Sequence, residues 1–169
     1  MLRISSVAFV ALVAGVGIAT IVDLRTRRIP NLLTGALTSV GLGLAAAGIS
    51  GMSVWMAMLG FVVGLALMLP GHALGATGAG DVKLMAAIGA VVGPGVAVKA
   101  FLFTAIAGGA LAVLVATRRR RLGATLAGTA RMIATPADAP REIQAAPRAS
   151  RFAYAPAIAV GSVLAVLIG

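Results

Sequence analysis

Two aspartates stand at unusual positions for a chain this apolar. Asp23 follows one long apolar run, and Asp81 precedes another within the stretch GATGAGDVKLM. The other two acids, Asp138 and Glu142, lie in a polar segment. Ionisable groups near a membrane interior are energetically costly and are usually functional. The sequence therefore directs attention to Asp23 and Asp81 as a candidate pair.

Two carboxyl groups that face each other have a specific chemistry. Like charges at close range cannot easily both ionise, so the pair shares one proton and titrates as a unit. The ionised carboxylate can take a proton from water as the water attacks a carbonyl carbon. The protonated carboxyl can donate a hydrogen bond to the carbonyl oxygen. Such a pair could hydrolyse a peptide bond if Asp23 and Asp81 meet.

Other hydrolytic chemistries are poorly supplied by this sequence. The chain has no cysteine, and its single histidine, His72, is predicted to be a solvated loop residue. No HExxH motif is present, so we expect no metal site and no cofactor.

Structural roles remain open for each aspartate considered alone. Asp23 could form an interfacial ion pair with Arg25 or Arg27. Asp81 could cap a helix, with two glycines before it as a flexible lead-in.

The elements that must position these residues are apolar. Of the 169 residues, 60% are hydrophobic and only 11% are charged, whereas soluble domains carry about a quarter charged residues. We predict an all-α, polytopic membrane protein that forms a single membrane-embedded domain over residues 1–169. Six apolar runs cover residues 5–22, 32–49, 54–69, 84–92, 96–116 and 152–168. The third run is expected to end at Pro70-Gly71, and Gly93-Pro94-Gly95 separates the fourth run from the fifth.

Lengths and charges predict about six transmembrane helices. A span needs ~20 apolar residues, so the fourth run is too short unless its helix begins before Asp81. With six spans, intervals 23–30, 71–83 and 117–151 share one side and hold 12 of the 14 Lys and Arg residues. Basic loops stay in the cytoplasm, so both termini are predicted on the extracytoplasmic side and both aspartates at the cytoplasmic boundary.

The interval 117–151 is predicted to be a basic cytoplasmic loop between helices five and six. The stretch TPADAPREIQAAPRAS at 135–150 resembles a mobile linker, and residues near 122–134 could form a short amphipathic helix. The four arginines at 118–121 favour a topology anchor that contacts acidic lipids over a nucleic-acid site, because no aromatic stacking platform accompanies them.

The motifs resemble those of type IV prepilin peptidases, which are GxGD intramembrane aspartyl peptidases. GAGDVKL at 78–84 matches the GxGD motif, and DLRTRRIPN at 23–31 matches the segment with the first catalytic aspartate. YAPAIAVG at 154–161, which contains Tyr154 and Pro156, resembles the final-helix segment. The resemblance runs from the first helix to the last. By this resemblance Asp23 and Asp81 are the catalytic aspartates.

The resemblance also implies a substrate and a form of the enzyme. Family members remove a short basic leader from prepilins or pseudopilins at the cytoplasmic face of the bacterial inner membrane. Longer members add a region with paired CxxC motifs and a methyltransferase activity. This chain lacks cysteines and resembles the short, peptidase-only form found with tight-adherence (Flp-type) pili.

Several neighbouring residues could support the site. Gly78 and Gly80 remove side-chain bulk, so that an extended substrate could approach Asp81. Lys83 could bias the proton balance of the pair or extend to the interface. Pro30 is expected to start the second helix.

Further residues have mainly structural interpretations. Asn31 could hydrogen-bond near the site, although a helix cap is its default role. Tyr154 and Trp55 suit interfacial anchoring.

Two other functions would use the same aspartates differently. A proton-coupled transporter subunit would carry protons on them, although the sequence has no evident inverted repeat. A scaffold for a membrane assembly would use them only for binding.

The resemblance and the apolar composition imply the partners of this chain. We expect a prepilin or pseudopilin substrate and membrane lipids, and we expect no nucleic acid.

Overall fold

Helices make up nearly all of the described part of the chain. A computed structural model describes residues 4–75, 77–118 and 154–168, and within these ranges no strand occurs. The predicted all-helical fold is thus confirmed. The helices are α1 (Ser6–Thr26), α2 (Asn31–Ala46), α3 (Val54–Ala73), α4 (Ala79–Val92), α5 (Pro94–Arg118) and α8 (Ala155–Ile168).

The helices fall into two length classes. Helices α1 and α3, and residues Pro94–Val115 of α5, are long and apolar enough to cross a membrane. Helix α2 has 16 residues, and α4 and α8 have 14 each, which gives lengths of about 21–24 Å. These lengths are below the ~30 Å of a hydrocarbon core. The apolar helices indicate a membrane protein, while six spans and the side of each terminus stay predictions.

Most helix boundaries lie where local sequence signals predict them. Pro30 is the N-cap of α2, and the Ser53 hydroxyl accepts a hydrogen bond from the Met56 N–H at 3.3 Å at the start of α3. The chain reverses between α4 and α5 at Gly93, whose φ of 79° glycine adopts without strain. Helix α4 begins before Asp81, as its short apolar run required.

The predicted end of run three at Pro70-Gly71 is wrong. Helix α3 continues to Ala73, and the Leu74 N–H still donates to the Pro70 carbonyl at 3.1 Å. A proline in the last turn removes only one backbone donor, so the helix persists past it to Ala73, and Gly75 follows the C-cap with a φ of 80°. His72 is therefore an exposed helical residue, not a loop residue.

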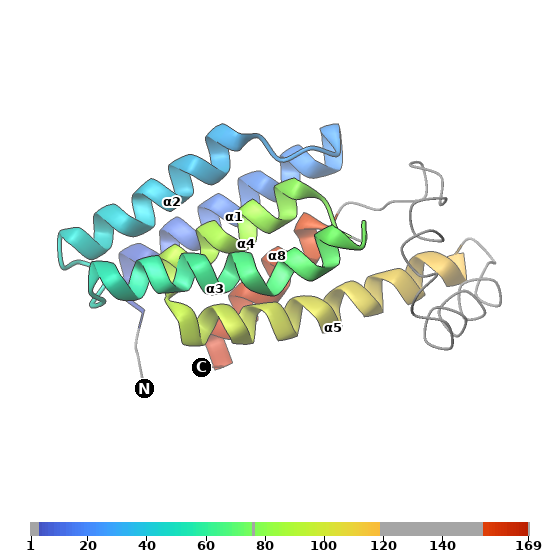
Figure 1. The fold of residues 1–169 in the computed structure, drawn as a ribbon. Coiled ribbons are helices and arrows are strands. Elements are labelled where there is room, and N and C mark those ends of the chain that lie inside the picture. The colour runs from blue at the N-terminus through green and yellow to red at the C-terminus, as the bar shows by residue number, and fades with distance from the viewer. Residues whose placement is uncertain (1–3, 76, 119–153, 169) are drawn as a thin grey trace.

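Helix α4 lies in the middle of the bundle and contacts the other five described helices (Figure 1). Eleven of its 14 residues are buried. Glycines allow this close packing: a Cβ on Gly60 of α3 would overlap the carbonyl oxygen of Gly89. A Cβ on Gly41 of α2 would lie 2.8 Å from the backbone carbonyl carbon of Ala90. Backbone thus packs on backbone around the helix that carries Asp81.

Different helix termini meet at the two ends of the bundle. Helix α1 begins and α8 ends at one end, while α1 ends and α4 begins at the other (Figure 1). Apart from the last two residues of α5, the predicted basic loop 117–151 lies outside the described residues. The amphipathic helix predicted near 122–134 lies outside them as well.

Candidate active site

Asp23 lies on the last turns of α1 with its side chain inside the protein. It is 6% exposed, and its Oδ2 accepts a hydrogen bond from the backbone N–H of Ala155 at 3.2 Å. Ala155 is the first residue of α8, where backbone donors have no partner within the helix. The start of α8 therefore binds the carboxylate that α1 carries.

Asp81 lies in the first turn of α4 and is 9% exposed. Its Oδ2 accepts a hydrogen bond from the backbone N–H of Gly78, the N-cap residue, at 3.0 Å. This contact is half of a capping box, so Asp81 does cap its helix. The cap engages one carboxylate oxygen and orients the side chain. A capping role and a chemical role are compatible at this residue.

Both carboxyl groups are buried, Asp23 near the end of α1 and Asp81 near the start of α4, and these two helices contact each other. The charge of Asp81 acts on the phenol of Tyr154, which immediately precedes α8. Burial, and then this charge, raises the pKa of the Tyr154 phenol above its ordinary value. The phenol therefore stays protonated at neutral pH and can donate hydrogen bonds. Asp23, Asp81 and Tyr154 form one polar cluster from three elements.

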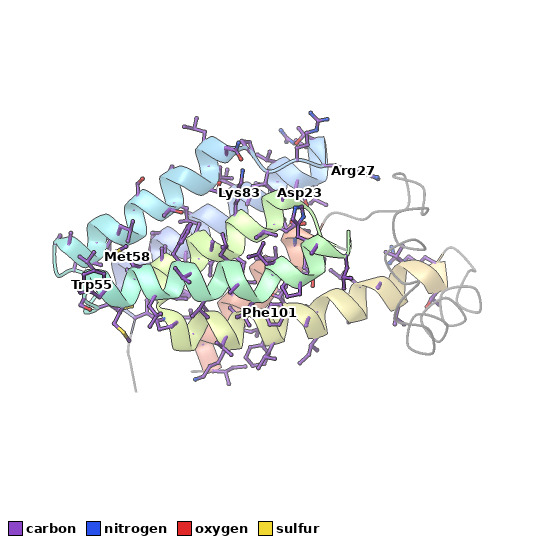
Figure 2. All side chains as sticks on the ribbon, in the orientation of Figure 1. Asp23, Arg27, Trp55, Met58, Lys83 and Phe101 are labelled. Atoms are coloured by element: carbon purple, nitrogen blue, oxygen red, sulfur yellow. The ribbon has the colours of Figure 1, made fainter. Side chains whose placement is uncertain are left out.

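The cluster lies at the end of the bundle that carries basic residues. Figure 2 shows Asp23, Arg27 and Lys83 at this end, whereas Trp55 and Met58 lie at the opposite end. Arg27 closes α1 in the left-handed conformation, with φ 52°, and its N–H donates to the Asp23 carbonyl at 2.8 Å. The backbone of Asp23 thus forms part of the turn that leads to α2.

The loop between α1 and α2 contacts the first turn of α4. A Cβ on Gly80 would lie 3.0 Å from the Cβ of Ile29, so the loop passes directly over this glycine. Beyond the loop, the Lys83 Nζ donates to the Asn31 Oδ1 at 2.9 Å. These contacts join the segments that carry the two aspartates.

The supporting residues occupy positions that differ in part from the predictions. Asn31 is not the N-cap of α2, because Pro30 holds that position without a side-chain cap bond. The expected cap is therefore wrong, and the Asn31 amide oxygen instead accepts from Lys83. The side of Gly80 on which a Cβ would lie faces Ile29 and not open space. Pro156 is the second residue of α8.

Sequence reasoning did not identify three contributors to the site. Ala155 acts through its backbone N–H, which no side-chain motif reveals. Ile29 acts through its packing on Gly80. Gly108 of α5 accommodates the Tyr154 ring, since a Cβ there would lie 2.7 Å from the ring carbon Cε2. Only the YAP segment at 154–156 gave a signal, and it pointed to the tyrosine and the proline.

The chemistry available at the cluster is that of carboxyl groups and a phenol. No group of three or more His, Cys, Asp or Glu side chains comes together within the described ranges. Two interacting carboxyl groups can share a proton, activate a water molecule and polarise a carbonyl group.

Comparison with known proteins gives one family. No curated protein and no solved structure matches the chain. The model of the type IV leader peptidase family matches residues 10–113, which include both aspartates and the GxGD motif. Tyr154 and Pro156 lie beyond this match, although the resemblance noted above extends to the final helix. Because the match covers more than half of the sequence, the chain belongs to the type IV leader peptidase family.

Proposed function

We propose that this protein is an intramembrane aspartic endopeptidase that removes the short basic leader from type IV prepilins or pseudopilins. Membership of the family makes it a leader-peptidase-like protease. The observation that carries the finer proposal is the pair of buried aspartates on two helices that contact each other, one of them in the GxGD motif.

The reaction follows from one proton shared by the pair. The ionised carboxylate removes a proton from water, and the oxygen of that water forms a bond to the carbonyl carbon of the scissile peptide. The protonated carboxyl gives its proton to the carbonyl oxygen. The product of these two transfers is a tetrahedral intermediate with two hydroxyl groups on the former carbonyl carbon. As the C–N bond breaks, the nitrogen takes the remaining proton from the pair and leaves as an amine. One hydroxyl group of the intermediate returns its proton to the pair as the C=O bond re-forms. A carboxylic acid and an amine are released, and the pair again holds one proton.

The proposed location is the cytoplasmic face of a bacterial-type inner membrane, with the chain crossing it several times. Support comes from Arg25, Arg27, Arg28 and Lys83, which are exposed at or near the ends of α1 and α4 that carry the aspartates. Basic residues favour the cytoplasmic side of a membrane. A prepilin whose basic leader remains in the cytoplasm would present its cleavage site there. Without cysteines, no methyltransferase region of the CxxC type is proposed.

The test is coexpression with a candidate prepilin, followed by measurement of the pilin mass. We expect the wild-type protein to remove the leader, and Asp23→Asn and Asp81→Asn each to lower the rate by about 10²–10⁴-fold. Asp138→Asn, which alters an acid in the polar segment, serves as the matched control. All four proteins should insert to equal levels.

Near-normal cleavage by either active-site variant would overturn the assignment. If the wild-type protein cleaves no prepilin and conducts protons in proteoliposomes, the proton-coupled transporter becomes the better interpretation.

A further inference from the structure

The turn that follows the Asp23 helix, and the first residue of α2 after it, contact the Asp81 helix on both sides of Asp81 in sequence. On one side, Ile29 packs tightly over Gly80, where an added Cβ would lie 3.0 Å from the Cβ of Ile29. On the other, the Lys83 Nζ donates to the Asn31 Oδ1 at 2.9 Å. We call Ile29, Asn31, Gly80 and Lys83 the clasp. The clasp joins α4 to Ile29 and Asn31, which lie within eight residues of Asp23.

We propose that the clasp sets the separation of the two carboxyl groups, and that Asn31 and Lys83 are positioning residues for the hydrolysis. This inference rests on the proposed peptidase function. It also assigns Gly80 a different role from the one that the sequence suggested. In this role, the absence of a side chain at Gly80 accommodates Ile29.

The hydrogen bonds of the two aspartates do not fix their separation. Asp23 and Asp81 lie on different helices. Asp23 accepts a hydrogen bond from the start of α8, and Asp81 accepts one from the N-cap residue of its own helix. These bonds orient each carboxylate but do not tie one aspartate to the other. A displacement of about 1 Å can cost ~10²-fold in rate. The clasp directly connects the two chain segments close to both side chains.

The polar half of the clasp contributes little to folding. Asn31 and Lys83 are both exposed, so water competes for the hydrogen bond between them. Substitutions there can change the reaction while the protein still folds and inserts. The packed half is less suitable for a test, because a side chain at Gly80 would require Ile29 to shift, and this shift would alter the packing as well as the reaction.

The experiment compares Asn31→Leu and Lys83→Met with the wild-type protein in purified cleavage assays across pH. We expect each variant to lower kcat about tenfold with little change in KM. The pH–rate profile of a coupled pair is bell-shaped, and stronger coupling moves the two apparent pKa values of the pair farther apart. Without the clasp the carboxyl groups can separate and couple less strongly, so we expect a narrower pH–rate profile in both variants. A simple loss of folded protein would not change the width of the profile.

Two further proteins separate tethering from a charge effect of Lys83. Lys83→Arg keeps a cationic donor and should retain most of kcat. Combining Asn31→Lys with Lys83→Asn exchanges donor and acceptor, and it should recover part of the loss seen in each single variant. Lys99→Met, which alters an exposed lysine on α5, is the matched control and should behave as wild type.

Other charged and titratable groups could shape the same profile. Those of the described residues near this end are Arg25, Arg27, Arg28, His72, Lys83, Arg118 and Tyr154. Only Lys83 changes in the lysine variants, and none changes in Asn31→Leu. A narrowing that is common to both variants therefore reports the clasp and not the loss of one charge.

An unchanged bell width in Asn31→Leu, or a double exchange no better than the single variants, would overturn the inference. The peptidase assignment would survive that result, provided that Asp23→Asn and Asp81→Asn are inactive. Conversely, a wild-type protein that cleaves no prepilin would remove the proposed function and this inference together.

Discussion

Replacing Gly89 with alanine tests whether the packing of α4 on α3 holds Asp81 in place. A Cβ on Gly89 would lie 2.6 Å from the carbonyl carbon of Gly60, whereas ordinary contact begins at 3.4 Å. The carbonyl oxygen of Gly60 would lie closer still, so the two backbones must separate by at least ~0.8 Å, because neither can rotate away as a side chain could. Asp81 is about 12 Å farther along the same helix, so a rigid shift of α4 reaches it. We expect cleavage to fall by up to ~10²-fold.

The stability change can be separated from the helix propensity of alanine. Gly43 is exposed on α2, and a Cβ there would meet no atom within 4 Å. Gly43→Ala therefore makes the same substitution in a helix interior without overpacking. Overpacking costs typically about 1–3 kcal/mol, so Gly89→Ala should be less stable than Gly43→Ala by about that amount. Thermal unfolding in detergent measures this difference, and the prepilin cleavage rate measures the effect on the site.

Equal cleavage rates and equal unfolding midpoints for Gly89→Ala and Gly43→Ala would refute this reasoning. A loss of stability without a loss of rate would show that α4 can shift without disturbing Asp81.

Two further predictions concern the Tyr154 side of the cluster. Gly108→Ala should displace the phenol, since a Cβ there would lie 2.9 Å from the Tyr154 hydroxyl oxygen, and should slow cleavage, whereas Gly109→Ala meets open space and should not. Equal prepilin cleavage rates for the two alanine variants would contradict this. Because the pKa of the Tyr154 phenol is raised, the phenol stays neutral from pH 5 to 9. Tyr154→Phe should therefore lower the rate by about three- to tenfold at every pH in that range, and a pH–rate measurement that shows a shifted limb would count against it.

Much of the fold was predictable because its signals are local. Pro30 and Ser53 start helices, and Gly93 ends one, through backbone preferences that act within a few residues. The end of α3 was missed because Pro70 lies in the last turn, where the loss of one donor does not stop a helix. The number of membrane spans was inferred from the distribution of charged residues, and this number stays a prediction.

The site was predictable only in part, because its contacts join distant segments. Asp23 and Asp81 stood out as rare acids in an apolar chain. Asn31 and Lys83 were each noticed, but nothing in the sequence paired two residues that are 52 positions apart. The Ala155 N–H could not be identified, since every non-proline residue carries the same backbone donor.

The burial of α4 has a consequence for the order in which this protein matures. With 11 of 14 residues covered by its neighbours, this helix offers almost no surface to lipid and gains its partners only from the completed bundle. Helices α1, α3 and α5 are long enough to insert independently, whereas α4 depends on them. A half-assembled chain would therefore lack a fixed Asp81. If the proposed function is right, newly made protein cannot cut other membrane proteins before its own assembly is finished.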